Sequence, residues 1–152
     1  MITEHHSTAK RIQQTLMLIY VDLDGMKQIN DLYGHQEGDN ALKNTANILK
    51  SAFREADIIG RIGGDEFAVF GMVIEDKGRN GITSRINEKL EYHIGEYAAH
   101  SPKPYKLSLS HGIAFADPQK PFSFDSLLSE ADQNMYLKKQ EKRGSENSHR
   151  KK

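Results

Sequence analysis

Two acidic clusters are the residues of this sequence best suited to chemistry on phosphates. Asp22 and Asp24 come at the end of an apolar run, residues 16–21, and Asp65 and Glu66 follow a pair of glycines. Mg²⁺ binds one or two protein carboxylates and keeps coordination positions for phosphate oxygens. A helix cap or a hairpin turn explains either cluster taken alone. The two clusters together, each beside apolar strand residues, favour a magnesium site.

Two other cation and nucleotide motifs are excluded by their spacing. An EF-hand loop that began at Asp22 would need Asp or Asn at its fifth position and Gly at its sixth, where Met26 and Lys27 stand. The G-x-x-x-x-G-K-S/T sequence of P-loop nucleotide-binding proteins occurs nowhere in the chain. The acidic clusters therefore belong to neither of these classes.

The hydrophobic pattern predicts the elements that position the clusters. Strands are predicted at residues 16–23, 58–62, 67–73 and 107–115, the first apolar enough to be covered on both faces. After a loop that contains Gly34, helices are predicted over residues 37–53 and 82–94, and a last helix carries Leu127, Leu128, Ala131 and Met135, with Ser123 or Asp125 as its N-cap. This order is the split βαβ plan of an α+β, ferredoxin-like fold. It predicts an antiparallel-containing central sheet flanked by helices that lie on one face, with the first and third strands central.

Composition limits the class of protein further. The chain has 152 residues, the size of one domain, and 21 Lys plus Arg balance 21 Asp plus Glu, so the electrostatic footprint of a nucleic-acid-binding protein is missing. The sequence has no cysteines, no apolar run of the ~18 residues that a membrane span needs, and no signal peptide. We therefore expect a soluble cytoplasmic domain that binds no nucleic acid and does not itself insert into a membrane. An anchor upstream in a longer protein is compatible with this expectation.

The segment Gly63-Gly-Asp-Glu-Phe67 is the signature after which the GGDEF family of diguanylate cyclases is named, and the chain resembles this family over residues 16–143. Further matching motifs, in family order, are Asp22-Leu-Asp-Gly-Met-Lys-Gln-Ile-Asn-Asp31, Gly34-His35, Gly38-Asp39, Ser110-His-Gly112 and Ala131-Asp132 with Tyr136. The resemblance implies a nucleotidyl-cyclase palm-like fold and a role in bacterial signal transduction.

The resemblance also divides the chain. Family members normally open with an Asp-x-Leu-Thr-Gly-Leu-x-Asn-Arg stretch, which has no match in residues 1–15. We therefore expect residues 1–15 to be a lead-in left from a truncated N-terminal segment, residues 16–143 to be the GGDEF domain, and residues 144–152 to be a polar basic tail. An upstream sensory or pairing domain in the full-length protein is part of this expectation.

The metal and catalytic residues follow from the resemblance. It implies Mg²⁺, with Mn²⁺ as a substitute, bound by Asp22, the backbone carbonyl of Leu23, Asp65 and Glu66. Asp65 would also serve as general base for the ribose 3′-hydroxyl of the substrate, and Glu66 would support the metal site. Lys27 would neutralise phosphate charge in the transition state.

The resemblance implies GTP as the substrate and names the residues that read its guanine and approach its α-phosphate. Asn30 and Asp39 would read guanine, because a carboxylate accepts from the N1–H and N2–H₂ groups that adenine lacks. This choice disfavours ATP, which would leave Asp39 without a partner. Gly63 and Gly64 would let the backbone approach the α-phosphate, where a side chain would collide.

The basic residues that match the family's contacts to the triphosphate come from two parts of the chain. Lys27 follows the first acidic cluster, and Lys139 and Arg143 stand four residues apart on one face of the last predicted helix. Arg143 also fits a solvated helix end, because the Gly-Arg-Asn ending common in the family is replaced here by Arg143-Gly144-Ser145.

A regulatory motif precedes the signature. Arg54-Glu-Ala-Asp57 matches the R-x-x-D inhibitory site at which family members bind their product, and Arg61 matches a residue recruited from the same surface. An arginine can fork onto guanine or phosphate and an aspartate can accept from guanine. An ion pair at a helix end is the alternative interpretation.

The resemblance thus predicts a diguanylate cyclase that condenses two GTP into cyclic di-GMP and two pyrophosphates. It would act as a homodimer with one GTP half-site in each protomer, and cyclic di-GMP would be both product and inhibitor. The alternative is a catalytically silent module that binds GTP or cyclic di-GMP and signals through a partner domain.

Overall fold

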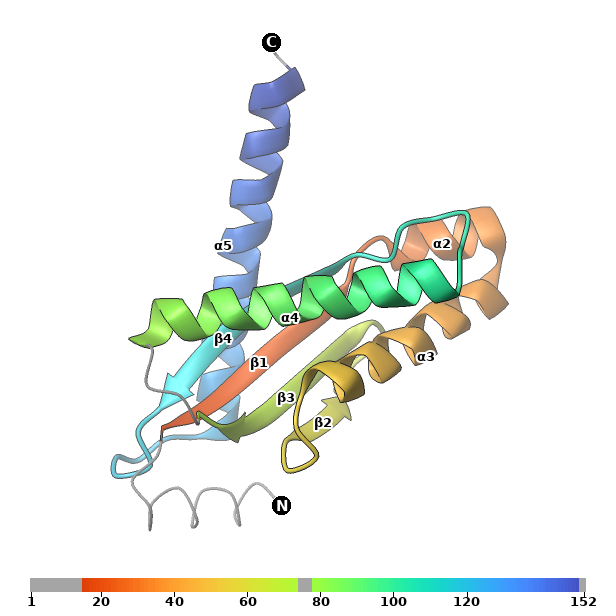
Figure 1. The fold of residues 1–152 in the computed structure, drawn as a ribbon. Coiled ribbons are helices and arrows are strands. Elements are labelled where there is room, and N and C mark those ends of the chain that lie inside the picture. Colours follow the sequence, from red (N-terminus) through yellow and green to blue (C-terminus); the bar gives the residue numbers. More distant parts are fainter. Residues whose placement is uncertain (1–14, 74–77, 151–152) are drawn as a thin grey trace.

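The computed structural model describes residues 15–73 and 78–150, which form one four-stranded sheet with helices packed against it (Figure 1). In chain order the elements are β1 (Leu16–Leu23), α2 (Met26–Tyr33), α3 (His35–Ala52), β2 (Ile58–Arg61), β3 (Glu66–Met72), α4 (Gly78–His100), β4 (Leu109–Ala116) and α5 (Phe124–Arg150). The strand order is β2-β3-β1-β4, and every neighbouring pair is antiparallel. The predicted split βαβ plan is confirmed, with the first and third strands in the centre.

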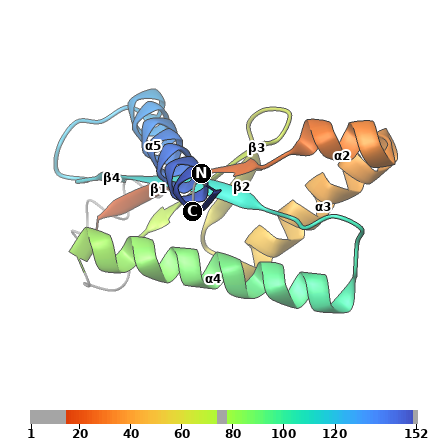
Figure 2. The same ribbon diagram turned by 90° about the horizontal axis from the view of Figure 1, so that it is seen from above.

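Both faces of the sheet are covered. Ile19 and Val21 of β1 are fully buried in a core shared with α2, α3 and α4, whereas Leu18 and Tyr20 belong to a second core shared with α5. Figure 2 shows α4 and α5 on opposite sides of the strands. The prediction that the helices lie on one face is therefore wrong for α5. The continuous apolar run of β1 requires this second cover, because its alternate side chains point to opposite faces.

The close approach of α5 to β4 depends on Gly112. A Cβ atom at this position would overlap the backbone carbonyl of Ala131 and the backbone N of Met135. Ser123 is the N-cap of α5, since its Oγ accepts a hydrogen bond of 3.1 Å from the backbone N–H of Ser126. The helix extends beyond the sheet to Arg150 (Figure 1). Residues 144–150, within the predicted polar basic tail, are thus a continuation of α5.

The helix α2 was not predicted. Its eight residues make only about two turns, so the apolar residues Met26, Ile29 and Leu32 are too few to establish a helical period. Gly25 and Gly34 flank it with positive φ angles of 69° and 93°, which glycine adopts without steric cost. A short helix between two such glycines cannot be distinguished from a loop by its sequence pattern.

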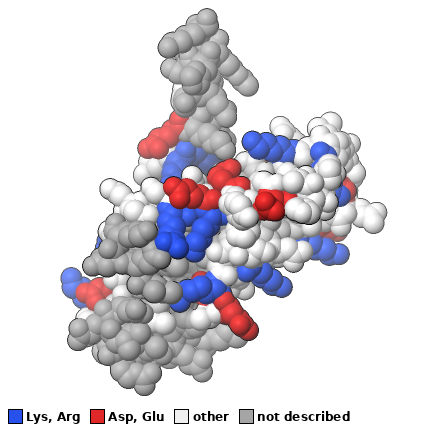
Figure 3. Space-filling view, in the orientation of Figure 1, with Lys and Arg blue, Asp and Glu red and all other residues white. Residues whose placement is uncertain are grey.

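The predicted lead-in lies outside the described residues except for Thr15, whose carbonyl accepts a hydrogen bond from Val73. Among the described residues, no helix is both long enough and apolar enough to cross a membrane. On the face that carries α4, acidic and basic side chains are interspersed (Figure 3), as the zero formal charge leads one to expect.

Candidate active site

A cavity of about 610 Å³ lies where β1 ends and β4 begins. Five parts of the chain line it: the end of β1, the start of α2, the turn between β2 and β3, the segment before β4, and α5. The lining residues are Asp22, Leu23, Asp24, Gly25, Gln28, Asp65, Lys106, Ser108, Ser110 and Lys139. The two acidic clusters of the sequence therefore meet in one cavity.

Asp22 has one carboxylate oxygen paired and one without a partner. Its Oδ2 accepts a hydrogen bond of 2.7 Å from Lys139 Nζ, while its Oδ1 is buried and receives no hydrogen bond from any described residue. Burial raises the pKa of Asp22 even though Lys139 acts in the opposite direction. A buried acceptor without a donor is costly unless a ligand satisfies it, so this atom points to a bound cation.

Asp24 has a different role from Asp22. Its carboxylate accepts hydrogen bonds from the hydroxyls of Ser108, at 2.9 Å, and Ser110, at 2.8 Å. Its backbone N–H also donates to the carbonyl of Ser108 at 2.9 Å. Asp24 therefore fastens the segment before β4 to the end of β1. Nothing in the spacing of Ser108 and Ser110 from Asp24, more than 80 residues away, predicted these bonds.

Backbone hydrogen bonds hold the turn that carries Asp65 and Glu66 against β1. The backbone N–H of Leu23 donates to the carbonyl of Asp65 at 2.9 Å, and Asp22 lies opposite Glu66 in the strand register. Arg61 Nε donates to the carbonyls of Gly63 and Gly64, each at 3.1 Å. The backbone of Asp65 is thereby held beside the end of β1.

Glu66 lies opposite Asp22 in the strand register but outside the lining of the cavity. It is a hydrogen-bond partner of Tyr20, whose pKa is raised by burial and then by this contact. Glu66 Oε2 lies 2.6 Å from the place that a Cβ of Gly63 would take, so the first glycine of the signature makes room for the Glu66 side chain. Asp65 lines the cavity and Glu66 does not.

The donor set of the cavity fits Mg²⁺. Within residues 15–73 and 78–150, no three His, Cys, Asp or Glu side chains converge closely enough to hold an ion by themselves. Mg²⁺ does not need three, because it takes hard oxygen ligands and commonly keeps water or phosphate oxygens in its other positions. Asp22 Oδ1, the carbonyl of Leu23 and the carboxylate of Asp65 are such oxygens on residues that line one cavity.

The predicted guanine-reading residues lie outside this cavity. Asn30 Oδ1 is a second buried acceptor with no partner among the described residues, and its side chain fills the space that a Cβ of Gly38 would need. Asp39 is exposed and lines a different cavity, between α3 and β2. Lys27 is exposed and is not part of the lining of the acidic cavity. The side chain of Arg143 lies outside the described residues.

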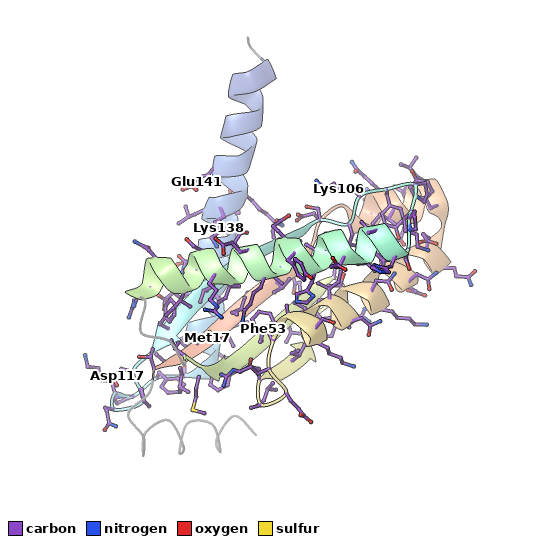
Figure 4. The ribbon with its side chains drawn as sticks, viewed as in Figure 1. Met17, Phe53, Lys106, Asp117, Lys138 and Glu141 are labelled. Carbon is purple, nitrogen blue, oxygen red and sulfur yellow. The ribbon has the colours of Figure 1, made fainter. Side chains whose placement is uncertain are left out.

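The R-x-x-D residues lie at a separate cavity of about 200 Å³ beneath α4. Arg54 Nη2 is 3.2 Å from Asp57 Oδ1 and donates to the carbonyl of Met72 at 2.7 Å, so the two residues of the motif form an ion pair. Met17 and Phe53, labelled in Figure 4, form part of the apolar wall of this cavity.

Two basic residues of α4 that line this second cavity were not identified from the sequence. Arg61, which the sequence grouped with Arg54 and Asp57, does not line it. Arg85 and Lys89, four residues apart, line it together with Arg54. The sequence pattern drew attention only to the apolar face of α4. Arg61 is not part of the lining; its guanidinium binds the turn carbonyls instead, and it lines the cavity between α3 and β2. The structure therefore places Arg61 apart from Arg54 and Asp57.

Comparison with known proteins agrees with the geometry of the acidic cavity. The family model of the diguanylate cyclase GGDEF domain matches residues 1–145. Diguanylate cyclase DgcP of Escherichia coli (strain K12) is 34% identical over 143 residues, which cover 93% of this chain and 40% of DgcP. The chain spans between 21% and 40% of the length of five curated relatives that it matches.

Solved structures give the same result. The GGDEF domain of TpbB (YfiN) from Pseudomonas aeruginosa has a TM-score of 0.72 and 30% identity, covering 92% of this chain and 85% of that one. A sensory box/GGDEF family protein from Caulobacter crescentus CB15 has a TM-score of 0.75 and 26% identity, covering 92% and 88%. The predicted palm-like fold is confirmed by these neighbours. The chain belongs to the GGDEF family of diguanylate cyclase domains.

Proposed function

We propose that this domain condenses two GTP molecules into one cyclic di-GMP and releases two pyrophosphates. The observation that carries the proposal is the cavity in which Asp22, with its unpartnered Oδ1, faces Asp65 of the GGDEF turn and Lys139 of α5. The alternative is a domain that binds GTP or cyclic di-GMP without turnover, and release of pyrophosphate distinguishes the two.

In the proposed mechanism, Asp22, the Leu23 carbonyl and Asp65 hold Mg²⁺, with Mn²⁺ as a substitute. When bound, the metal offsets the negative charge of the phosphates. Glu66, held by Tyr20, supports the turn and is a further oxygen donor from the opposite strand position. Lys139 and Lys27 supply positive charge to the triphosphate, and Arg143 extends this set along α5.

The bond changes are the same in both halves of the reaction. Asp65 accepts the proton of a ribose 3′-hydroxyl, the 3′ oxygen forms a bond to the α-phosphorus of the other GTP, and the bond to the pyrophosphate oxygen breaks. Gly64 leaves space for the α-phosphate beside the turn, since nothing lies within 4 Å of the place of its Cβ, while Gly63 makes room for the Glu66 side chain next to it. With one such cavity in each protomer, two protomers would face each other, and the dimer would supply proximity and orientation.

Substrate choice is proposed to depend on Asn30 and Asp39. The buried, unpartnered Oδ1 of Asn30 supports this role, because the N1–H and N2–H₂ groups of guanine are donors of the kind it lacks. Adenine offers neither donor on that edge, which makes ATP the poorer substrate.

Product inhibition is proposed at the cavity beneath α4. Arg54, Arg85 and Lys89 supply positive charge there, and the apolar wall suits the faces of guanine bases. Cyclic di-GMP carries both phosphates and guanines, so it matches this lining. Arg61 is left out of this site because it lines another cavity.

The decisive experiment is pyrophosphate release from GTP with Mg²⁺, measured on the chain alone and on the chain fused to a dimeric leucine zipper. Turnover in the fusion that Asp65→Asn reduces by about 100-fold or more would support the cyclase mechanism. Saturable GTP binding without pyrophosphate release in either form would favour the silent binding module. Retained turnover in Asp65→Asn would refute the role of this residue.

A further inference from the structure

The segment before β4 carries a lysine into the acidic cavity. Leu107 and Leu109 are buried, at 5% and 8% exposure, in the core on the α4 side. Ser108 and Ser110, which alternate with them, point the other way and bind Asp24. Lys106 shares the side of the two serines and lines the same cavity as Asp22, Asp65 and Lys139.

The backbone around Lys106 is fixed on both sides. Two residues after it, Ser108 accepts from the backbone N–H of Asp24 at 2.9 Å and donates to its carboxylate at 2.9 Å. One residue before it, the hydroxyl of Tyr105 donates to Glu37 at 2.7 Å. A side chain on a backbone held at both ends loses less conformational entropy when it binds a ligand.

Lys106 differs from Lys139 in the availability of its charge. Lys139 Nζ lies 2.7 Å from Asp22 and 3.8 Å from Asp24, so aspartates already surround it. None of the ion pairs between described residues includes Lys106. Lys106 is therefore a cation on the wall of the cavity whose charge no described carboxylate neutralises.

We infer that Lys106 binds the β- and γ-phosphates of the bound nucleoside triphosphate, the group that leaves as pyrophosphate. This assignment rests on the proposed function, which places GTP in this cavity. Lysine suits the task because its ammonium group is a compact point charge with several rotatable donors, and hydrogen bonds between charged groups are the stronger kind. Lys106 is thus a binding residue that the family motifs of the sequence do not include.

The test compares ligands that differ only in the terminal phosphates. Titration with 3′-deoxy-GTP and 3′-deoxy-GMP in Mg²⁺ measures binding without turnover, because neither ligand has the attacking hydroxyl. In Lys106→Gln, the Kd for 3′-deoxy-GTP should rise about fivefold, whereas the Kd for 3′-deoxy-GMP should stay within about twofold. Lys106→Arg should keep most of the affinity for the triphosphate.

Lys120→Gln is the matched control. It makes the same charge change on an exposed lysine whose backbone N–H binds the carbonyl of Asp117. Figure 4 shows Asp117 and Lys106 at opposite ends of the sheet. Both ligands should bind Lys120→Gln as they bind the unsubstituted chain, and thermal unfolding should show that each variant is folded.

Three results would overturn the assignment. Equal 3′-deoxy-GTP affinity in Lys106→Gln and the unsubstituted chain would refute Lys106 while leaving the proposed function intact. An equal loss for the triphosphate and the monophosphate would show that Lys106 does not act on the terminal phosphates. Absence of 3′-deoxy-GTP binding to the unsubstituted chain would refute the proposed function and this inference together.

Discussion

Lys139 Nζ lies 2.7 Å from a carboxylate oxygen of Asp22, although the two residues are 117 positions apart in the chain. The contact forms because α5 crosses the face of the sheet beside β1 and β4, where Gly112 allows close packing. The ammonium group lies on one side of the Asp22 carboxylate, and the buried Oδ1 is left for a ligand. The helix α5 therefore both covers one face of the sheet and supplies the lysine that contacts Asp22.

Asp22→Asn should separate stability from activity. Burial raises the pKa of Asp22 above the ordinary value of 3.8, so its ionised form is disfavoured in the folded protein. We expect pyrophosphate release to fall about 100-fold or more, while the free energy of unfolding at pH 7 changes by no more than about 1 kcal/mol. Urea unfolding and pyrophosphate release measure the two effects.

The pH dependence gives the control for this variant. A carboxyl whose folded pKa is raised stabilises the protein at acid pH, and this contribution is lost as the pH rises from 3.8 through the folded pKa. Because asparagine does not titrate, the stability of Asp22→Asn should lack this pH-dependent contribution. A loss of stability above about 3 kcal/mol in Asp22→Asn would instead assign Asp22 a structural role.

His111 should make the protein less stable in acid. It is 6% exposed, and burial, followed by the charge of Lys138 at 3.2 Å, lowers its pKa from 6.5 to about 4. Between these values the unfolded chain binds more protons, so stability rises with pH from about 4 to 6.5 and is constant above. The full effect is on the order of 3 kcal/mol.

His111→Leu isolates this effect. The difference in unfolding free energy between pH 7 and pH 4.5 should be smaller in His111→Leu than in the unsubstituted chain, because the leucine cannot take up a proton. Comparison of the two proteins also cancels the contribution of Asp22, which runs in the opposite direction. Identical pH profiles for both proteins would contradict the prediction.

Gly112→Ala should destabilise the fold. The new methyl group would overlap the backbone of α5 at Ala131 and Met135, and a backbone cannot rotate away as a side chain can. Overpacking of this kind costs about 1–3 kcal/mol, and it should also reduce activity by displacing Lys139. Chemical denaturation measures the loss.

Gly95→Ala is the matched control for Gly112→Ala. Gly95 lies within α4, is exposed, and has nothing within 4 Å of the place that a Cβ would take. Alanine there should stabilise the protein by about 0.5–1 kcal/mol, since glycine is the poorer helix former. If both substitutions had the same sign, the packing explanation for Gly112 would fail.

Arg54→Ala should abolish inhibition by cyclic di-GMP. The substitution removes a cation from the cavity beneath α4 and leaves the carboxylate of Asp57, 2% exposed, without its ion pair. The inhibitor concentration for half-maximal effect should rise about tenfold or more. Lys89→Gln should raise it less, and Lys120→Gln, outside the cavity, should not change it. Unaltered inhibition in Arg54→Ala would exclude this cavity as the inhibitory site.

Local pattern was enough to predict the strands and the main helices. Apolar residues that adjoin or alternate mark β1 and β3, and apolar residues at a period of 3.6 mark α3 and α4. Both patterns involve only residues that are close together in the sequence. The GGDEF signature and the Asp22 motif were equally visible, because the family keeps them as contiguous segments. The short helix α2 escaped prediction because its eight residues span only about two turns between two glycines.

The sequence by itself determined which side chains this protein has for chemistry: Asp22, Asp65, Lys139 and the glycines of the turn. Only the tertiary structure decided which of them share a cavity. Strand register sets Asp22 opposite Glu66, and the crossing of α5 brings Lys139 to Asp22. The bonds of Ser108 to Asp24 hold Lys106 at the cavity, and Arg61 turns to the glycine carbonyls. Except for the local contact of Arg61, these contacts join residues far apart in sequence, so they depend on how whole elements pack, which no local pattern of residues encodes.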